Sequence, residues 1–238
     1  MLLKIMLLKE NSVIPTQLAQ DIYHNFREQN KSEHIAGLTT IQLLLNICQA
    51  QKPINILELG GGLGTLTKLL LAYSPTEATL DTYEDNLYFQ QKLRENLQNY
   101  QSKYTLITDY RILPPKRSYD LVIVDGGNGK TGDGGYPDAV WFIISYLQSV
   151  KIIYIEGYRC LQRLLIRKAL RRRFIYRLQA YAPAGEKKAG GLKIECRLCH
   201  SPFIRWINFL FWEIMEWTSV ENFIKYRVNR LVKKFKHV

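Results

Sequence analysis

Four acidic side chains mark the ends of successive β-prone segments in this 238-residue chain. They are Glu58, Glu84, Asp109 and Asp125. Carboxylates accept hydrogen bonds from hydroxyl and amine groups, so they suit a polar ligand. Because the strands of a parallel sheet end at one edge, where ligands bind in open α/β folds, these acids are expected to gather there. The pattern predicts one polar site built from several distant segments.

A glycine-rich turn accompanies the first of these acids. It follows the apolar run of residues 54–59, which is typical of a strand buried on both faces, and it precedes leucines at helical spacing. Gly60, Gly62 and Gly64 alternate in the turn, where a side chain would keep a ligand away from the main chain. The free N–H groups that begin the next helix favour an anionic or strongly polar group. The turn therefore predicts a nucleotide-like ligand.

The spacing of the glycines distinguishes between nucleotide-binding motifs. The dinucleotide motif G-x-G-x-x-G would need a third glycine at Thr65, and Lys68 does not fit a phosphate-binding P-loop. The pattern present is E-x-G-x-G-x-G from Glu58. It resembles the first motif of the class I S-adenosylmethionine (SAM) methyltransferases. A purely structural glycine turn is the alternative interpretation.

This resemblance covers about residues 38–198 and implies a role for each matching position. Glu58 would face the methionine end of SAM, Glu84 would accept hydrogen bonds from the ribose hydroxyls, and Asp125 would lie beside the sulfonium methyl group. The other implied cofactor-binding positions are Gly60, Gly61, Gly62 and Gly64 along the cofactor, Tyr83 and Asp85 beside the adenosine, and Asp109 or Tyr110 at the adenine. For Asp109, a helix or turn cap is the alternative.

The elements that must position these residues alternate along the chain. They predict an α/β fold with a doubly wound, seven-stranded, mostly parallel sheet, a C-terminal antiparallel hairpin and helices on both faces. The expected strands cover residues 54–59, 78–83, 104–108, 119–124, 151–155, 174–181 and 191–199. The expected helices cover residues 16–29, 39–51, 63–71, 137–147 and 159–173.

Three regions follow from this order. Residues 1–52 form N-terminal helices covering the site, residues 53–200 a SAM-binding Rossmann-like domain, and residues 201–238 an aromatic, basic and amphipathic helical tail. In the first region Tyr23 and His34 are lid candidates, although a histidine satisfied by the core or by solvent is the simpler interpretation. The N-terminus is apolar but interrupted by lysines, too short for a membrane span and without a cleavage site, which predicts a cytoplasmic protein.

A loop with six glycines in ten positions follows Asp125. Such a loop either covers a substrate or serves as a flexible connection. Its polar candidates for contact with the methyl acceptor are Lys130, Asp133 and Tyr136.

The expected reaction is methyl transfer from the sulfonium of SAM, which needs a positioned acceptor and, when the acceptor carries a proton, a base. Asp125 is the first candidate for the catalytic base and Glu156 the second. The stretch after Asp125 lacks the [DN]-P-P-[YF] motif of amine methyltransferases and the Pro-Cys nucleophile of cytosine-carbon enzymes. O-methylation of a sugar or other small molecule remains. Methylation of RNA and SAM-fold binding without catalysis are the alternatives.

Metal-dependent, catechol-like O-methyltransferases have a similar layout. Their magnesium is held by an acid after the fourth strand, which Asp125 matches, and by an Asp-Asn pair after the fifth. Glu156-Gly157 departs from that pair. Because of this departure, no metal site is assigned.

The four cysteines are too few and too scattered for a disulfide framework. The residues from Cys196 to His200 spell C-x-x-C-H, the c-type haem attachment pattern. This pattern falls at the end of the last expected strand, and no second ligand cluster accompanies it. We interpret Cys196 and Cys199 as ordinary strand cysteines rather than a haem, zinc or redox site.

The formal net charge is +12. Its sources are the helix expected over residues 159–173 and the C-terminal tail, whose apolar helical face follows a segment rich in Phe and Trp. A basic amphipathic helix beside tryptophans suits an anionic membrane surface. Packing on the chain's own domain or on a homodimer partner is the alternative. Nucleic acid is the rival anionic partner, although no RNA or DNA module is recognisable.

Overall fold

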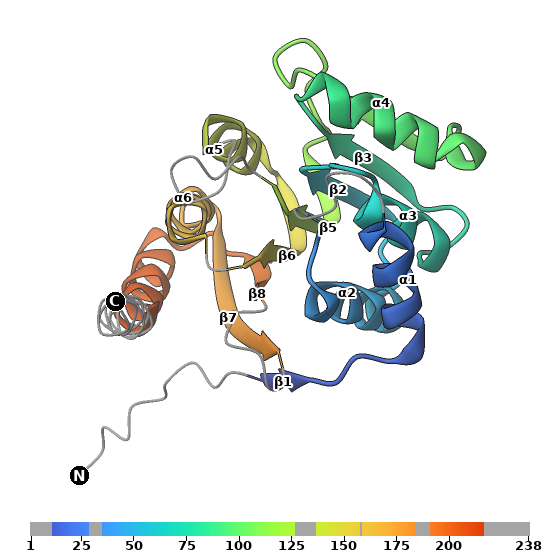
Figure 1. The fold of residues 1–238 in the computed structure, drawn as a ribbon. Helices are drawn as coiled ribbons and strands as arrows, with labels where there is room; N and C mark the ends of the chain where they lie inside the picture. Colours follow the sequence, from blue (N-terminus) through green and yellow to red (C-terminus); the bar gives the residue numbers. More distant parts are fainter. Residues whose placement is uncertain (1–10, 29–34, 127–136, 158, 184–190, 217–238) are drawn as a thin grey trace, which may run out of the picture.

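The structure is a computed structural model that describes residues 11–28, 35–126, 137–157, 159–183 and 191–216. These residues form an α/β fold around one eight-stranded sheet (Figure 1). The strands are β1 (Asn11–Val13), β2 (Asn55–Leu59), β3 (Thr79–Tyr83), β4 (Tyr104–Ile107), β5 (Ser118–Val124), β6 (Ser149–Glu156), β7 (Phe174–Pro183) and β8 (Gly191–Leu198). The helices are α1 (Gln17–Arg27), α2 (Leu38–Gln51), α3 (Thr65–Tyr73), α4 (Leu87–Asn96), α5 (Pro137–Tyr146), α6 (Cys160–Leu170) and a helix over residues 202–216, which we call the outer helix.

The predicted seven-stranded sheet is confirmed as strands β2 to β8, in the order β7-β8-β6-β5-β2-β3-β4. Only β8 runs antiparallel to its neighbours β6 and β7, which gives the predicted C-terminal hairpin. The sequence predicted seven strands, one fewer than the structure has. The additional strand is β1, which pairs with the C-terminal end of β7. Three residues are too few to show the alternation that marks a strand in sequence. Helix α4, which begins after the cap Asn86, was also not predicted.

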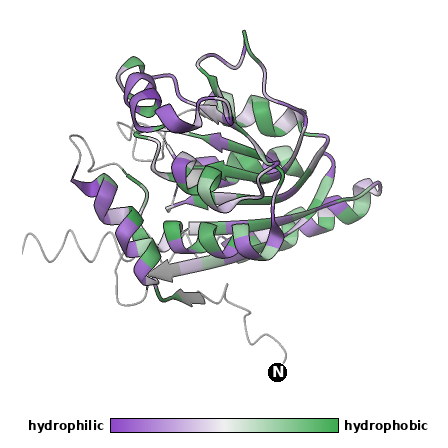
Figure 2. Ribbon diagram, turned by 90° about the vertical axis from the view of Figure 1, so that its right-hand side faces the viewer, coloured by the Kyte–Doolittle hydropathy of each residue, from purple (hydrophilic) through white to green (hydrophobic). Residues whose placement is uncertain are grey.

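Two apolar layers hold the sheet between helices. On one face α1, α2 and α3 pack on the strands, and on the other face α5, α6 and the outer helix do so. Strand residues such as Leu57, Val122 and Ile153 are fully buried, as parallel strands covered on both faces require. In Figure 2 hydrophobic and hydrophilic residues occur both in the strands and in the covering helices.

The outer helix attaches to the edge of β7 through polar groups. The side-chain amide of Asn208 accepts a hydrogen bond from the Tyr176 N–H and donates one to the Tyr176 carbonyl, each at 2.9 Å. Trp212 Nε1 donates to the same carbonyl at 2.6 Å. These contacts satisfy backbone groups that an open sheet edge would otherwise leave to solvent or to another chain.

Cys48, Cys196 and Cys199 have free thiols. Burial raises the pKa of the Cys196 thiol, so this side chain stays protonated and unreactive. In the part of the chain that the structure describes, no group of three or more His, Cys, Asp or Glu side chains could hold a metal ion. Cys196 lies in β8, whereas Cys199 follows the end of that strand.

Candidate active site

Strand register places the acidic residues at one edge of the sheet. The last paired residues of β3, β2, β5 and β6 form one row across it: Tyr83, Leu59, Val124 and Ile155. The residues that follow them, Glu84, Gly60, Asp125 and Glu156, therefore share the carboxyl edge. This is the position at which open α/β sheets bind ligands.

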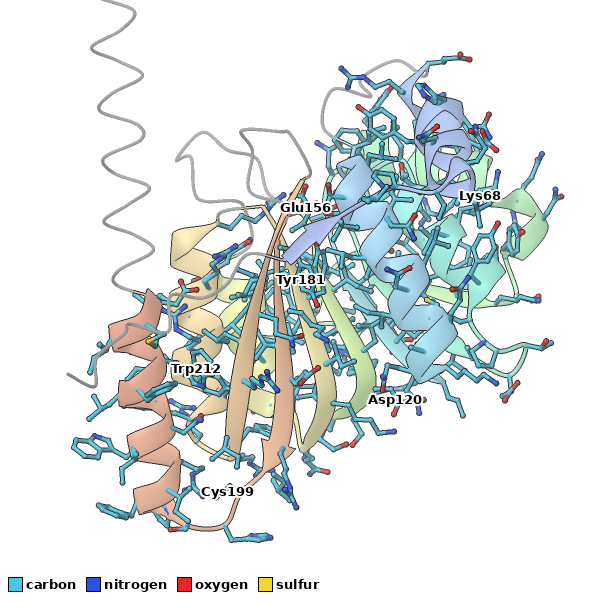
Figure 3. All side chains as sticks on the ribbon, turned by 90° about the horizontal axis from the view of Figure 1, so that it is seen from below. Lys68, Asp120, Glu156, Tyr181, Cys199 and Trp212 are labelled. Atoms are coloured by element: carbon cyan, nitrogen blue, oxygen red, sulfur yellow. The ribbon has the colours of Figure 1, made fainter. Side chains whose placement is uncertain are left out.

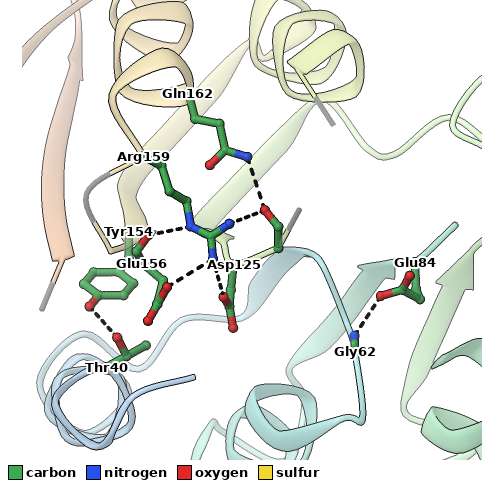
Figure 4. A network of polar contacts seen from close by, with 9 residues as sticks. Thr40, Gly62, Glu84, Asp125, Tyr154, Glu156, Arg159 and Gln162 are labelled. Carbon is green, nitrogen blue, oxygen red and sulfur yellow. Dashed lines mark hydrogen bonds and ion pairs between the residues drawn. The ribbon is translucent and has the colours of Figure 1, made fainter. Parts of the chain in front are cut away.

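Arg159, just before α6, bridges two neighbouring acids of this row, Asp125 and Glu156 (Figure 4). Its Nη2 lies 3.2 Å from Asp125 Oδ1 and 3.1 Å from Glu156 Oε2. Its Nε donates to the Glu156 carbonyl oxygen at 2.7 Å, and its Nη1 donates to the Gly126 carbonyl oxygen. Gln162 Nε2 also donates to that Gly126 oxygen, at 3.3 Å. One guanidinium therefore ties the ends of β5 and β6 together.

Two further arginines continue from Arg159 along α6 at four-residue spacing. Arg163 Nη2 donates to the Gly157 carbonyl at 2.9 Å, and its Nη1 lies 3.7 Å from Glu216 of the outer helix. Arg167 Nε donates to Glu213 Oε1 at 2.6 Å. In the sequence this segment counts as a source of the positive charge, but these three arginines are largely buried and paired within the chain, so they add little to an exposed basic surface. The four-residue spacing, which places them on one helix face, was the available signal.

Asp125 differs electrostatically from an exposed aspartate. Burial and then the neighbouring Glu156 carboxylate raise its pKa well above the ordinary value, and the Arg159 guanidinium opposes this shift. A raised pKa makes the carboxylate a stronger proton acceptor near neutral pH. Asp125 therefore has the electrostatics expected of a general base.

The Asp125 and Glu156 pair does not fit a divalent cation. Both carboxylates bind the same nitrogen of Arg159, so the guanidinium fills the position that a bridging metal would need. A metal in that position would also lie directly against the fixed positive charge of arginine. In the described residues, Asp125, which matches the acid of the magnesium enzymes, and Glu156, which departs from their pattern, thus share an ion pair with Arg159.

The glycine turn is bound to β3. The N–H groups of Gly60 and Gly61 donate to the Tyr83 carbonyl at 2.9 Å and 3.0 Å, and Gly62 N–H donates to Glu84 Oε2 at 2.8 Å. Gly60 has a φ of +104°, and a Cβ there would overlap the Asp125 carbonyl oxygen. A Cβ on Gly62 would meet open space. The turn is therefore packed against β5 at Gly60 and open at Gly62.

Glu84 follows β3 directly and is 2% exposed. Besides Gly62 N–H, its carboxylate accepts a hydrogen bond from Asn86 N–H at 2.9 Å. The contact with the ribose hydroxyls that the resemblance implies stays a prediction. Glu84 lies on the side of the turn opposite to Asp125 (Figure 4).

Glu58 lies inside β2, deeper than the other acids, and is completely buried. Its Oε2 accepts hydrogen bonds from Thr67 Oγ1 at 2.6 Å and from Thr82 Oγ1. Its Oε1 has no hydrogen-bond partner among the residues that the structure describes. Burial raises the pKa of Glu58 from 4.5 to about 7, against the opposing effect of the two threonines. The predicted contact with the methionine end of SAM stays a prediction.

The raised pKa of Glu58 predicts a stability that falls as pH rises. The folded state holds the proton of Glu58 up to about pH 7, whereas an unfolded glutamate releases it near pH 4.5. We expect this side chain to lower the free energy of unfolding by up to about 3 kcal/mol between these pH values. Glu58→Gln should remove this part of the slope in urea unfolding measured from pH 4.5 to 8. The exposed Glu95→Gln is the control, and equal slopes in wild type and Glu58→Gln would contradict the prediction.

Aromatic side chains line the side of the edge predicted for adenine. Tyr110 is 7% exposed, and its ring centroid lies 6.0 Å from that of Tyr83 and 5.2 Å from that of Phe142. Asp109 Oδ1 accepts a hydrogen bond from Arg111 N–H at 2.8 Å. This contact is that of a turn cap, the alternative to a contact with adenine. Asp85 is exposed at the end of β3.

Helix α2 joins the site from the N-terminal region. Thr40 Oγ1 and the Tyr154 hydroxyl lie 2.9 Å apart, which ties the first turn of α2 to β6 (Figure 4). Tyr23 is partly buried against the core beside α2, and its lid role stays a prediction. The other predicted candidates, His34, Lys130, Asp133 and Tyr136, lie outside the described residues.

No family model and no curated protein sequence matches the chain. Solved structures do match its fold. An O-methyltransferase from Bacillus cereus in complex with SAH aligns with a TM-score of 0.57 at 16% identity, over 77% of this chain and 92% of that chain. The O-methyltransferase TomG from Streptomyces achromogenes, in complex with SAM, gives 0.54 at 14% over 78% and 91%. A SAM-dependent O-methyltransferase from Thermotoga maritima gives 0.53 at 15% over 79% and 74%. The chain therefore has the Rossmann-like fold of class I methyltransferases.

Proposed function

We propose that the protein is a SAM-dependent methyltransferase that methylates a hydroxyl of a sugar or other small molecule. The observation that carries this proposal is the row of Glu84, Gly60, Asp125 and Glu156 at the carboxyl edge of a methyltransferase fold. A glycine turn with an open side lies between the acids at the two ends of this row. The solved structures of similar fold that contain SAM or SAH support the choice of cofactor.

In this proposal the glycine turn would hold the cofactor. Glu84 would accept hydrogen bonds from the ribose hydroxyls, and Glu58 would stabilise the methionine end of SAM. The remaining contacts come from Gly60, Gly61, Gly62 and Gly64 along the cofactor, from Tyr83 and Asp85 at the adenosine, and from Asp109 or Tyr110 at the adenine.

When bound, SAM would supply the methyl group: the new C–O bond to the acceptor would form as the S–C bond of the sulfonium breaks. Asp125 would hold the acceptor hydroxyl and take its proton. Arg159 is a positioning residue in this step, because it holds Asp125 and Glu156 in place. With both acids ionised, this group of three carries a net charge of −1, which favours the sulfonium cation over a neutral ligand.

Calorimetric titration of SAM and SAH into the wild-type chain and Glu84→Ala tests the proposal. We expect micromolar binding to the wild type and a loss of about 100-fold in affinity in Glu84→Ala. The reason is that the two charge-assisted hydrogen bonds proposed between Glu84 and the ribose hydroxyls disappear. Glu95→Ala removes an exposed acid on α4 that pairs only with Gln91 and Lys92, and it should bind SAM like the wild type. Urea unfolding of each variant shows whether the turn survives the loss of the Gly62 contact.

The outcome also separates the alternatives. A folded wild-type chain that binds neither SAM nor SAH would refute the proposal and leave a fold used for another purpose. If the chain binds SAM and methylates RNA rather than sugars or small molecules, the proposed cofactor would stand but the proposed acceptor would be wrong. The proposal retains the cytoplasmic and membrane-peripheral location predicted from the sequence, and the acceptor screen therefore begins with glycans and lipid-linked sugars.

A further inference from the structure

The outer helix turns an apolar face away from the protein. Seven large apolar side chains of this helix are between 37% and 68% exposed. They are Phe203, Ile204, Trp206, Ile207, Leu210, Phe211 and Ile214. At 100° per residue they fall within an arc of roughly 160° that contains no polar side chain. Figure 3 shows large side chains standing out from the side of this helix that faces away from the sheet.

The polar side of the same helix faces the protein. Asn208 and Trp212 hydrogen-bond the backbone of β7, and Glu213 and Glu216 pair with buried arginines of α6. Arg205 Nη1 donates to the Cys199 carbonyl at 2.6 Å. Turning the helix to bury its apolar face would break all of these contacts. The exposed face is therefore a property of the folded chain, and contiguous apolar surface of this kind marks an interaction site.

The C-terminal third of the sequence is strongly basic. Residues 159–238 contain 19 Lys and Arg against five Asp and Glu, whereas residues 1–158 contain 14 against 16. The exposed Arg171, Arg172 and Arg173 end α6 beside the outer helix, and the Arg171 guanidinium lies 4.9 Å from the ring of Phe209. A hollow near the first turn of the outer helix is lined by Arg172, Arg173, His200 and Arg205.

We infer that the apolar face of the outer helix inserts into the surface of an anionic lipid bilayer, with the surrounding arginines on the lipid headgroups. A helix lying in the interface needs one continuous apolar face and cationic side chains beside it, and both are present. Among the described residues, no helix is long and apolar enough to cross a membrane. This inference rests on the proposed function, because it specifies how the proposed enzyme would bind the membrane surface. Lipid binding can nevertheless be measured without any assay of methyl transfer.

Two other occupants fit the face less well. A second copy of the chain would bring the exposed Arg171, Arg172 and Arg173 of two chains close together, and like charges at short range repel each other. Nucleic acid would satisfy the arginines but would leave the exposed Ile, Leu and Phe side chains in contact with phosphate and water. An anionic bilayer complements both the charge and the apolar surface.

Flotation of the full chain with lipid vesicles tests the inference. We expect binding to vesicles that contain phosphatidylglycerol, weak binding to pure phosphatidylcholine, and partial release in high salt. Ile207→Glu combined with Phe211→Glu should weaken binding at least about 100-fold, because each buried side chain contributes about 2 kcal/mol. Ile112→Glu combined with Leu113→Glu is the matched control. These residues are also exposed, but they follow β4 at the opposite edge of the sheet.

Three results would overturn the inference. The first is equal binding to neutral and anionic vesicles, and the second is unchanged vesicle binding by the outer-helix variant. The third is a wild-type chain that ignores vesicles but self-associates, or retains RNA, in a way that Ile207→Glu with Phe211→Glu abolishes. SAM titration of the same variants separates the two proposals, since the outer-helix variant should bind SAM like the wild type whether or not it binds lipid.

Discussion

Replacing Arg159 by methionine is expected to destabilise the folded chain by about 3 kcal/mol at pH 8. The substitution keeps most of the side-chain volume but leaves Asp125 and Glu156 side by side without their shared cation. It also removes the donors to the Glu156 and Gly126 carbonyls. Removing one partner of a largely buried ion pair is costly because the remaining charges cannot return to water.

The loss should depend on pH in a definite direction. Without Arg159 the pKa of Asp125 rises further, so the folded state takes up a proton that the unfolded chain has lost. Stability of the variant should therefore be lost as pH rises through that pKa, and the difference from wild type should shrink towards pH 5. Urea unfolding at several pH values measures both effects.

A companion variant shows whether charge is the cause. Adding Asp125→Asn and Glu156→Gln to Arg159→Met removes the uncompensated charges and should recover a large part of the stability at pH 8. A change of less than about 1 kcal/mol at pH 8 for Arg159→Met alone would contradict the assignment of Arg159 as the residue that holds β5 and β6 together.

Gly60→Ala is expected to have a larger effect, a loss of more than about 4 kcal/mol in the free energy of unfolding. The added methyl group would overlap the Asp125 carbonyl oxygen and lie 2.6 Å from the Asp125 carbonyl carbon and 2.7 Å from Gly126 Cα. These are backbone atoms between paired strands, since Asp125 N–H donates to the Leu59 carbonyl at 2.9 Å. Neither strand end can shift without breaking the sheet.

Gly62→Ala provides the contrast within the same turn. Its methyl group meets no atom within 4 Å, and its φ of +51° costs an alanine about 1 kcal/mol. Urea unfolding should therefore give a folded Gly62→Ala protein and a Gly60→Ala protein that is unfolded or close to it. Equal stability of the two variants would show that the turn does not pack on β5 as described. If folded Gly62→Ala also binds SAM weakly in calorimetry, the turn contacts the cofactor.

The strand positions along the chain and the position of the acids were predictable because both follow from simple patterns. Buried parallel strands appear in the sequence as apolar runs, and each run ends where a polar residue or glycine follows. Glu84 and Asp125 directly follow such runs, so their place at the carboxyl edge needed only the rule that parallel strands end together. Glu156 closes its strand in the same way.

What was missed depends on contacts between distant residues. The four-residue spacing places Arg159 on one helix face with Arg163 and Arg167, but it does not reveal the contact with Asp125, because that partner comes from the end of β5. The buried carboxylate of Glu58 accepts hydrogen bonds from Thr67 and Thr82, which belong to α3 and β3 and are distant from it in sequence. The outward apolar face of residues 202–216 likewise required knowing that their polar side faces β7 and α6.

The buried Arg163 makes the outer helix and the candidate active site thermodynamically linked. One guanidinium contacts Glu216 on the outer helix and the carbonyl of Gly157, two residues before Arg159. Any partner that stabilises the packing of the outer helix on α6 and β7 therefore also stabilises this conformation of the loop after β6. By reciprocity, a cofactor that selects that loop arrangement strengthens the seating of the helix by the same free energy. We therefore expect lipid binding at the outer helix and cofactor binding at the candidate active site to strengthen each other.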